Sequence, residues 1–164
     1  MDESQAVVDQ RQYVIFGLCD EEYGMPIARV QSIIRYETPT PVPHAPEGIE
    51  GVFNLRGQVL PLIDLGWRLR GAPIVPTPSS RIIVAESGLG AVGLAVDHVQ
   101  EVASLAVSEI RPAPQAAIAS EMADAFEGVA NYGDRLIILL DADKALPKPV
   151  FTSAGVPQEA DPDV

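Results

Sequence analysis

The sequence predicts an all-β protein built of two small barrels. Roughly ten short apolar runs, separated by turn residues, follow one another along the chain, with almost no helical periodicity. One hairpin-like segment occurs twice, and a second segment recurs in the same order. Because an internal repeat decides the architecture of a chain, short strands in duplicated order favour two barrels over one sandwich.

The hairpin-like segments are residues 49–65 and 126–142, which align without a gap. Each has a turn dipeptide between apolar runs, Arg56-Gly57 in the first copy and Gly133-Asp134 in the second, which is the pattern of a β-hairpin. Similarity between the copies indicates fold, and the extra arginine of the first copy indicates function. The identical pairs are Glu50/Glu127, Gly51/Gly128, Val52/Val129, Asn54/Asn131, Leu62/Leu139 and Asp64/Asp141.

The second repeated segment reads Y-G-M-P-I-A-R-V-Q-S-I in residues 23–33 and V-G-L-A-V-D-H-V-Q-E-V in residues 92–102. Glycine and then Val-Gln recur in register, and each copy follows an apolar strand-like run. Val30 and Val99 therefore occupy equal positions in the two halves. We expect them to pack in the core or, if exposed, to line matching sides of a cleft between the lobes.

The first half is expected to begin with two strands around an acidic turn and then one helical turn leading into a third strand. A proline-rich loop precedes the first hairpin, in which Pro61 marks an edge or bulge position because it has no amide donor. Asp64 is expected to cap a short helix, with Trp67 packed in the core of the lobe. These elements are residues 12–18, 23–26, 27–36, 38–46 (loop), 51–55, 58–63 and 64–70.

The second half follows a proline-containing linker, residues 71–80. Its first two strands are expected to pair across Ser87-Gly88, and a further strand precedes the extended R-P-A-P segment. An alanine-rich stretch, helical or mobile, leads to the second hairpin and a last capped helical turn. The elements are residues 81–86, 89–96, 99–105, 111–114, 116–125, 129–132, 135–140 and 141–146.

Composition restricts the class of protein. The 164 residues are 47% apolar with a net charge of −12, and no apolar run approaches the roughly 18 residues of a membrane span. The nine arginines and two lysines are scattered singly, so binding to nucleic acid or to anionic lipid is not expected. The N-terminus lacks the features of a signal peptide, and a single cysteine fits a reducing cytoplasm.

The chain offers little for catalysis. His44 and His98 have no second ligand at metal spacing, and no phosphate-binding or nucleophile motif is present. Cys19 is expected to be a small buried side chain in a strand, without redox function. Asp64 and Asp141 occupy matching repeat positions between a strand and a helical turn, which favours helix capping over a catalytic carboxylate pair.

Arg56 is a candidate recognition residue. A turn arginine is usually only solvated, but this one stands where the second copy has glycine, the easier residue in a tight turn. Gly57 is then expected to supply the positive φ. The planar fork of arginine makes it a frequent anchor at protein interfaces.

Six motifs resemble the CheW coupling proteins of bacterial chemotaxis. They are D-E-E-Y-G-M (20–25), A-R-V-Q-S-I (28–33), G-V-F-N-L-R-G (51–57), P-L-I-D-L (61–65), V-G-L-A-V-D (92–97) and I-R-P-A-P (110–114). The resemblance covers residues from about 13 to 146, without an attached kinase or receiver segment. It implies two intertwined five-stranded SH3-like barrels with a groove between them.

The resemblance also implies a non-catalytic protein with no cofactor and no metal, which binds the cytoplasmic tip of methyl-accepting receptors and the regulatory domain of the histidine kinase CheA. Where many members have a glutamate that can pair with the N-L-R-G arginine, this chain has Ser32. The family's receptor and kinase contacts fall on Val30, Gly51, Asn54, Arg56, Val99 and Val102.

The sequence thus predicts a cytoplasmic adaptor at receptor arrays, with no direct membrane insertion. One alternative is a CheW-like adaptor of a receptor–kinase array outside chemotaxis, and a second is a small hydrolase built on Asp97-His98. The expected organisation is an N-terminal tail (1–11), a CheW-like domain (12–146, with repeats at about 12–70 and 81–146) and a disordered acidic, proline-rich tail (147–164).

Overall fold

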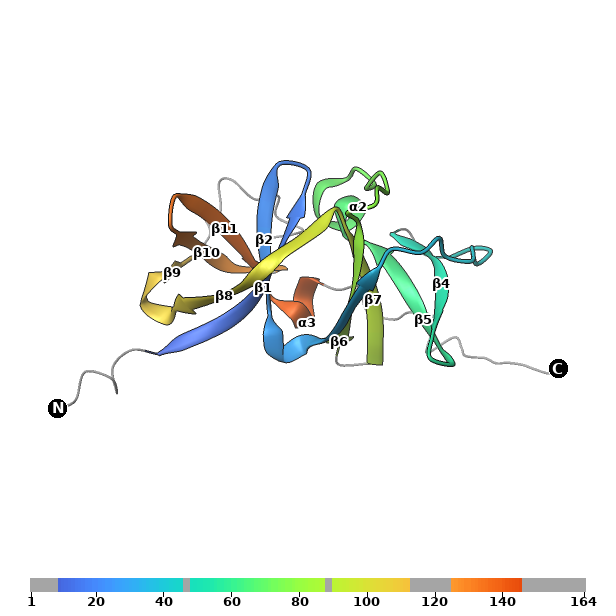
Figure 1. The fold of residues 1–164 in the computed structure, drawn as a ribbon, viewed down its shortest axis with the longest axis horizontal. Helices are drawn as coiled ribbons and strands as arrows, with labels where there is room; N and C mark the ends of the chain where they lie inside the picture. Colours follow the sequence, from blue (N-terminus) through green and yellow to red (C-terminus); the bar gives the residue numbers. More distant parts are fainter. Residues whose placement is uncertain (1–8, 46–47, 88–89, 113–124, 146–164) are drawn as a thin grey trace.

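A computed structural model describes residues 9–45, 48–87, 90–112 and 125–145. Two antiparallel-rich sheets form the molecule, each curled into a lobe (Figure 1). The strands are β1 (Gln10–Leu18), β2 (Glu21–Pro26), β3 (Val30–Arg35), β4 (Ile49–Leu55), β5 (Gln58–Asp64), β6 (Arg81–Ser87), β7 (Gly90–Val96), β8 (His98–Ala106), β9 (Ile110–Arg111), β10 (Phe126–Tyr132) and β11 (Arg135–Leu140). The helical segments are η1 (Ile27–Arg29), α2 (Leu65–Arg70), η2 (Val107–Glu109) and α3 (Ala142–Ala145).

The two halves of the chain exchange strands. One sheet has the order β8-β1-β2-β11-β10-β9 and the other β3-β6-β7-β5-β4, so each lobe contains strands from both halves. β3 crosses from the first half to pair with β6, and β8 crosses back to pair with β1. The parallel pairs β5–β7 and β11–β2 also join the halves. The expected intertwined double barrel is confirmed, although the first sheet has six strands and not five, because the short β9 joins it.

The repeated Val-Gln pair marks a β-bulge in each half of the chain. Val30 pairs with Ala85, and the register then shifts so that Gln31 is the extra residue of β3. Val99 pairs with Phe16 with the same kind of shift, which leaves Gln100 as the extra residue of β8. Since a bulge twists and bends a strand, each copy stands where its strand crosses to the other lobe.

The repeated glycines are places of close backbone approach. A Cβ on Gly51 would lie 2.2 Å from the carbonyl oxygen of Thr40, and a Cβ on Gly128 would lie 2.4 Å from that of Arg111. Beside them, Thr40 bridges to Val52, and Arg111 pairs with Val129 in the equivalent position. The two hairpins therefore occupy equivalent places in their lobes, as the ungapped repeat predicts.

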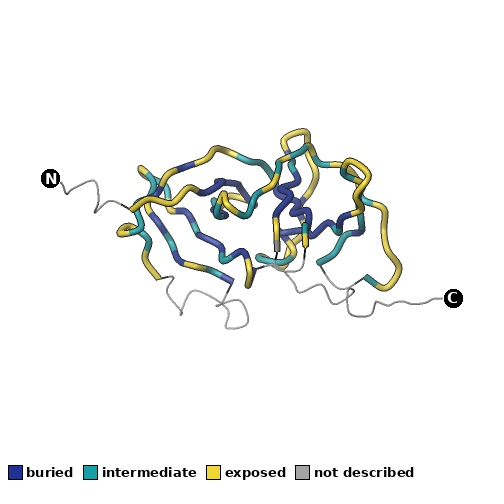
Figure 2. The backbone as a smooth tube through the Cα atoms, turned by 90° about the horizontal axis from the view of Figure 1, so that it is seen from below, coloured by how far each residue is buried: buried dark blue, intermediate teal, exposed yellow. Residues whose placement is uncertain are grey.

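The buried side chains join the lobes into one body. The larger cluster combines β1 and β2 residues such as Phe16 and Met25 with β5, β6 and β7 residues such as Leu62 and Leu94. A smaller cluster around Tyr13, Ile137 and other residues fills the six-stranded lobe. Figure 2 shows the buried segments inside both lobes and the exposed segments at the rims. In the ranges that the structure describes, no helix is long and apolar enough to cross a membrane.

Two expectations about single side chains are wrong. Cys19 is exposed and lies in the β1–β2 turn with a φ of 56°, because the strand ends one residue earlier. Trp67 is 38% exposed and not part of the core, because α2 turns its first residues, Leu65 and Gly66, toward the body. The expectations for residues 113–124, for the Ser87-Gly88 turn and for both tails fall wholly or partly outside the described residues.

Candidate protein-binding surfaces

The β4–β5 turn presents Arg56 in a left-handed conformation. Arg56 has a φ of 54° and Gly57 a φ of 84°, so both turn residues, and not the glycine alone, are left-handed. A positive φ at both central residues is required in a type I′ turn, the two-residue turn whose twist matches the flanking strands. Asn and Gly are the preferred residues of such a turn. The Asn54 Oδ1 accepts a hydrogen bond of 2.9 Å from the backbone N–H of Gly57 and closes the turn. Arg56 is exposed at its tip.

The guanidinium of Arg56 has no hydrogen-bond or ion-pair partner within the described part of the chain. The arginine of the second hairpin contrasts with it. Arg135 contacts Glu101 at 2.6 Å and Glu22 at 3.6 Å, and its guanidinium lies 5.2 Å from the ring centroid of Tyr132. One hairpin therefore has a neutralised cation, and the other presents a free one. Ser32 stands where relatives are expected to have a glutamate that pairs with the arginine of the first hairpin, and it lies in β3 opposite Val84.

Gly51 and Asn54 have structural functions that the sequence did not reveal. Gly51 is buried beneath the Thr40 backbone, and its counterpart Gly128 meets the same constraint. Asn54 closes the turn that holds Arg56. Both residues shape the hairpin, so Arg56 is the only one of the three predicted site residues of this hairpin that lies at its tip.

The valines lie on the crossing strands. Val30 on β3 and Val99 on β8 are partly buried and pack against the larger core cluster, so core packing accounts for much of each side chain. Val102 on β8 is 48% exposed, and its repeat counterpart Ile33 on β3 is 40% exposed. The six predicted residues thus separate into the hairpin around Arg56 and a second group on β3 and β8, which we call the crossing-strand face (Val30, Ile33, Val99 and Val102).

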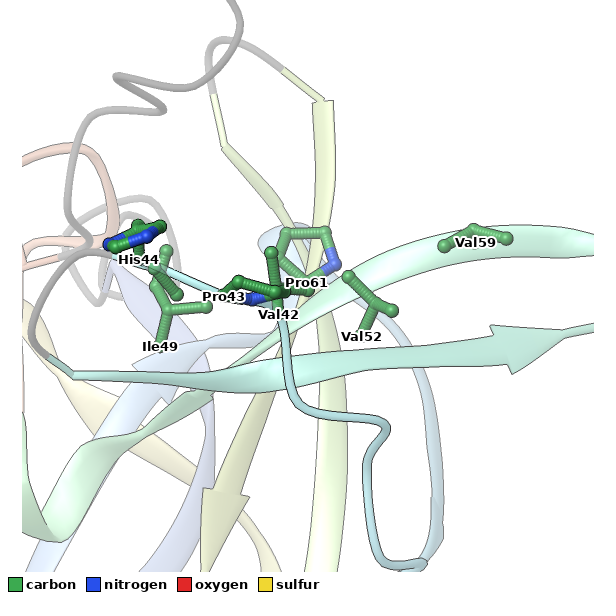
Figure 3. Close-up of a pocket in the computed structure, with 8 residues that line it drawn as sticks. Val42, Pro43, His44, Ile49, Val52, Val59 and Pro61 are labelled. Carbon is green, nitrogen blue, oxygen red and sulfur yellow. The ribbon is translucent and has the colours of Figure 1, made fainter.

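An apolar pocket beside the first hairpin was not predicted. It has a volume of about 430 Å³ and lies between the proline-rich loop and the outward face of β4 and β5 (Figure 3). The side chains at its mouth are apolar and exposed, with Val59 at 63% and Val42 at 41%. The sequence signal was the proline loop itself, which stands directly before the hairpin. The lining residues are Val42, Pro43, His44, Ala45, Ile49, Val52, Val59 and Pro61.

The second hairpin repeats part of this apolar face. By the ungapped alignment, Leu136 corresponds to Val59 and Ile138 to Pro61. Leu136 is 57% exposed, nearly as much as Val59. Pro61 pairs with Val52 at the position just before β5 begins to pair with β7. The absence of an N–H group at Pro61 therefore removes no hydrogen bond between the strands.

Glu50 and Asp64 form a pair of carboxyl groups that lines a second pocket beside Trp67. Burial, followed by contact with Asp64, raises the pKa of the half-buried Glu50 above its usual range. The Tyr36 hydroxyl donates to the Glu50 Oε1 at 3.2 Å, and burial together with that carboxyl raises the pKa of Tyr36 to about 12. The second copy differs, since Glu127 accepts from Arg11 at 2.9 Å and from the Tyr13 hydroxyl at 3.1 Å.

The conspicuous aspartates are engaged in the fold. Asp64 accepts from the backbone N–H of Trp67 at 3.0 Å, and Asp141 accepts from that of Asp143 at 3.0 Å, so both cap helices as predicted. The Asp97 Oδ2 accepts from the Cys19 amide at 2.6 Å. His98 lies directly over Gly17, whose added Cβ would meet the imidazole at 2.2 Å. These contacts leave the hydrolase alternative without an assembled site in the described residues, where no cluster of three metal-ligating side chains occurs either.

Comparison with known families agrees with this geometry. A sequence model of the CheW-like domain matches residues 12–149. The chain belongs to the CheW-like family. The chemotaxis protein CheW of Klebsiella aerogenes is 37% identical over 136 residues, which cover 83% of this chain and 81% of the relative. The CheW of Rhizobium meliloti is also 37% identical, over 84% of this chain and 88% of the relative.

A solved CheW structure has the same fold. The crystal structure of the scaffolding protein TtCheW from Thermoanaerobacter tengcongensis matches with a TM-score of 0.76 at 31% identity, over 91% of this chain and 96% of that one. The resemblance found in the motifs is therefore confirmed over nearly the whole double barrel. This CheW-like chain is therefore similar in sequence and fold to chemotaxis and scaffolding proteins of the same family.

Proposed function

We propose that this CheW-like protein is a non-catalytic adaptor that couples methyl-accepting chemotaxis receptors to the histidine kinase CheA and so controls autophosphorylation of the kinase. The observation that carries the proposal is Arg56, a cation at the tip of a left-handed turn that has no ion-pair partner among the described residues. A non-glycine residue in this conformation is strained, so stability alone would place glycine there, as at Gly133. An arginine so placed is best explained by a partner.

An adaptor needs separate surfaces for its two partners. We assign the regulatory domain of CheA to the first hairpin, where Arg56 and the apolar pocket lie on one element. The pocket is large enough for one or two apolar side chains, and its rim supplies exposed Val59. We assign the receptor tip, a helical hairpin, to the crossing-strand face, because exposed aliphatic side chains such as Ile33 and Val102 suit the apolar stripe of a helix.

The fold suits an adaptor in which binding at one surface changes the binding free energy at the other. β3 begins at the crossing-strand face and belongs to the same five-stranded sheet as the first hairpin. One core cluster connects both, so the two sites are held on a single rigid body. A coupling free energy of about 1–3 kcal/mol between sites is enough for regulation. The adaptor would act at the cytoplasmic side of receptor arrays, where its partners meet.

The proposal is tested by cosedimentation with receptor-containing membranes. We expect CheA to sediment with the receptors only when this protein is added, and Arg56→Ala to lose CheA while remaining bound to the receptors itself. Arg11→Ala, which removes an exposed cation elsewhere on β1, is the matched control and should behave as wild type. If CheA sediments equally well without the protein, or the protein itself stays in the supernatant, the proposed function is wrong.

A further inference from the structure

Two arginines stand directly opposite each other on β3 and β6. Arg35 pairs with Arg81 in the antiparallel register, so the side chains lie on one face of the sheet. Like charges in such a pair repel and destabilise the sheet. The arrangement is unexpected in a chain with a net charge of −12, in which cations are few.

The local contacts leave the pair uncompensated. Arg81 donates from Nη1 to the carbonyl oxygens of Ser80 at 2.8 Å and Pro78 at 3.0 Å, which fixes its position. Arg35 is exposed and has no partner in the described residues. The acidic neighbour Glu37 forms no ion pair with either arginine. Two guanidinium groups, one fixed and one free, therefore lie at the surface without an acidic partner among the residues that the structure describes.

The position of the pair relates it to the crossing-strand face. Ile34 and Tyr36 turn inward against the core, so Ile33 and Arg35 both point outward from β3. The repeat counterpart of Arg35 on β8 is Ser104, and that of Arg81 on β1 is Gln12, so only one side of the two-fold arrangement carries charge. On the outward side of β3, the aliphatic side chain of Ile33 is thus followed by a cationic end formed by Arg35 and Arg81.

We propose that Arg35 and Arg81 form a cationic site for a carboxylate side chain of the receptor tip, and that this contact fixes the direction in which the tip lies on the crossing-strand face. The inference rests on the proposed function and adds to it the chemistry of the partner. A carboxylate can accept from Arg35 in the bidentate manner and relieve the repulsion within the pair. An asymmetric charge on a nearly two-fold face gives orientation as well as affinity.

The test is a titration of the full chain with a receptor-tip helical hairpin, for wild type, Arg35→Gln and the charge-matched control Arg11→Gln. We expect Arg35→Gln to weaken binding about five- to 30-fold, within the range of an interface anchor, and to flatten the dependence of affinity on salt. Its melting temperature should equal or exceed that of wild type, because the opposed charge is gone. Arg11→Gln should bind within about twofold of wild type.

A charge exchange identifies the carboxylate. Arg35→Glu should lose binding, and replacing one acidic residue of the tip by arginine should restore it. Equal binding by Arg35→Gln and wild type would overturn the inference while leaving the adaptor function intact, whereas a wild type that does not bind the tip would refute the proposed function itself.

Discussion

At the scale of single residues, Arg56 has a backbone conformation that stability alone would give to glycine. Its backbone is held left-handed by a tight hairpin and by the Asn54 cap on Gly57. An L-residue in this region costs roughly 1–2 kcal/mol relative to a right-handed conformation, and glycine avoids most of that cost. The same position in the second hairpin is Gly133. The comparison of the two hairpins thus separates the residue that the turn favours, glycine, from the arginine that we propose a partner requires.

Replacement of Arg56 should therefore affect binding and not folding. Arg56→Ala should change the free energy of unfolding by less than about 1 kcal/mol, because the side chain is exposed. Arg56→Gly should match or exceed wild-type stability by up to about 1 kcal/mol. Both variants should weaken binding of the CheA regulatory domain by roughly 1–3 kcal/mol, about five- to 150-fold. Melting curves and titration calorimetry check this, and a variant that unfolds, or that binds as wild type, contradicts the assignment.

The carboxyl pair of Glu50 and Asp64 predicts a dependence of stability on pH. The folded state raises the pKa of Glu50 above the ordinary 4.5, so the stabilisation linked to its proton is complete below that value and is lost as pH rises through the folded pKa. Glu50→Gln cannot ionise and keeps an acceptor for Tyr36. We expect the variant and wild type to be equally stable near pH 4, and the variant to be the more stable at pH 8. Urea unfolding at both pH values measures the difference, and a constant difference would contradict the prediction.

Residue-scale prediction from sequence succeeded where a side chain bonds locally. The caps at Asp64 and Asp141 depend on neighbours along the chain, and both were predicted. Cys19 and Trp67 were misplaced because their burial depends on where a strand ends and which way a short helix faces. Neither property is fixed by local sequence pattern.

At the scale of elements, the repeated glycines give a matched test of the hairpin geometry. Gly51→Ala and Gly128→Ala should each lower the free energy of unfolding by about 1–3 kcal/mol, because the new methyl would meet a backbone carbonyl oxygen at 2.2 and 2.4 Å. Gly133→Ala is the control, since nothing lies within 4 Å of its Cβ position and only the positive φ opposes alanine. Chemical denaturation measures all three, and a neutral Gly128→Ala would show that the hairpins are not equivalent.

The two helix caps should differ in strength. Asp141→Ala loses an exposed cap and should cost about 0.5–2 kcal/mol. Asp64 also accepts from the Ile74 amide at 3.1 Å and is 2% exposed, so Asp64→Ala leaves a buried donor unpaired and should cost about 1–3 kcal/mol more. Partner affinity should stay nearly unchanged in both. A folded variant with native melting temperature but lost binding would contradict the assignment as structural caps.

Strand pattern predicted nearly every element but not the spaces between them. The hairpins, the crossing strands and the helical turns follow from alternation and turn residues in the sequence. The pocket of Figure 3 arises because the loop with Val42 and Pro43 folds over β4 and β5, a contact between segments that carries no local pattern. β9 was expected only as an extended segment, since two residues pairing with β10 are too short to be predicted as a strand.

At the scale of the whole molecule, the exchange of strands makes the double barrel one rigid unit. Each lobe contains strands from both halves, and a shared core connects them, so the hairpin and the crossing-strand face keep a fixed relation. The internal repeat predicted two lobes, while the exchange itself was expected from family resemblance. Pairing partners between similar strands cannot be chosen from hydrophobic pattern alone, because both choices bury the same residues.

The most direct test of the proposed adaptor function is sequential titration calorimetry. The receptor tip is titrated into the protein alone and then into the protein saturated with the CheA regulatory domain. We expect binding in both experiments, with free energies of binding that differ by no more than about 1–3 kcal/mol, the range of regulatory coupling. Failure of the tip to bind once the kinase domain is present, or failure of either partner to bind the free protein, would contradict an adaptor with two separate surfaces.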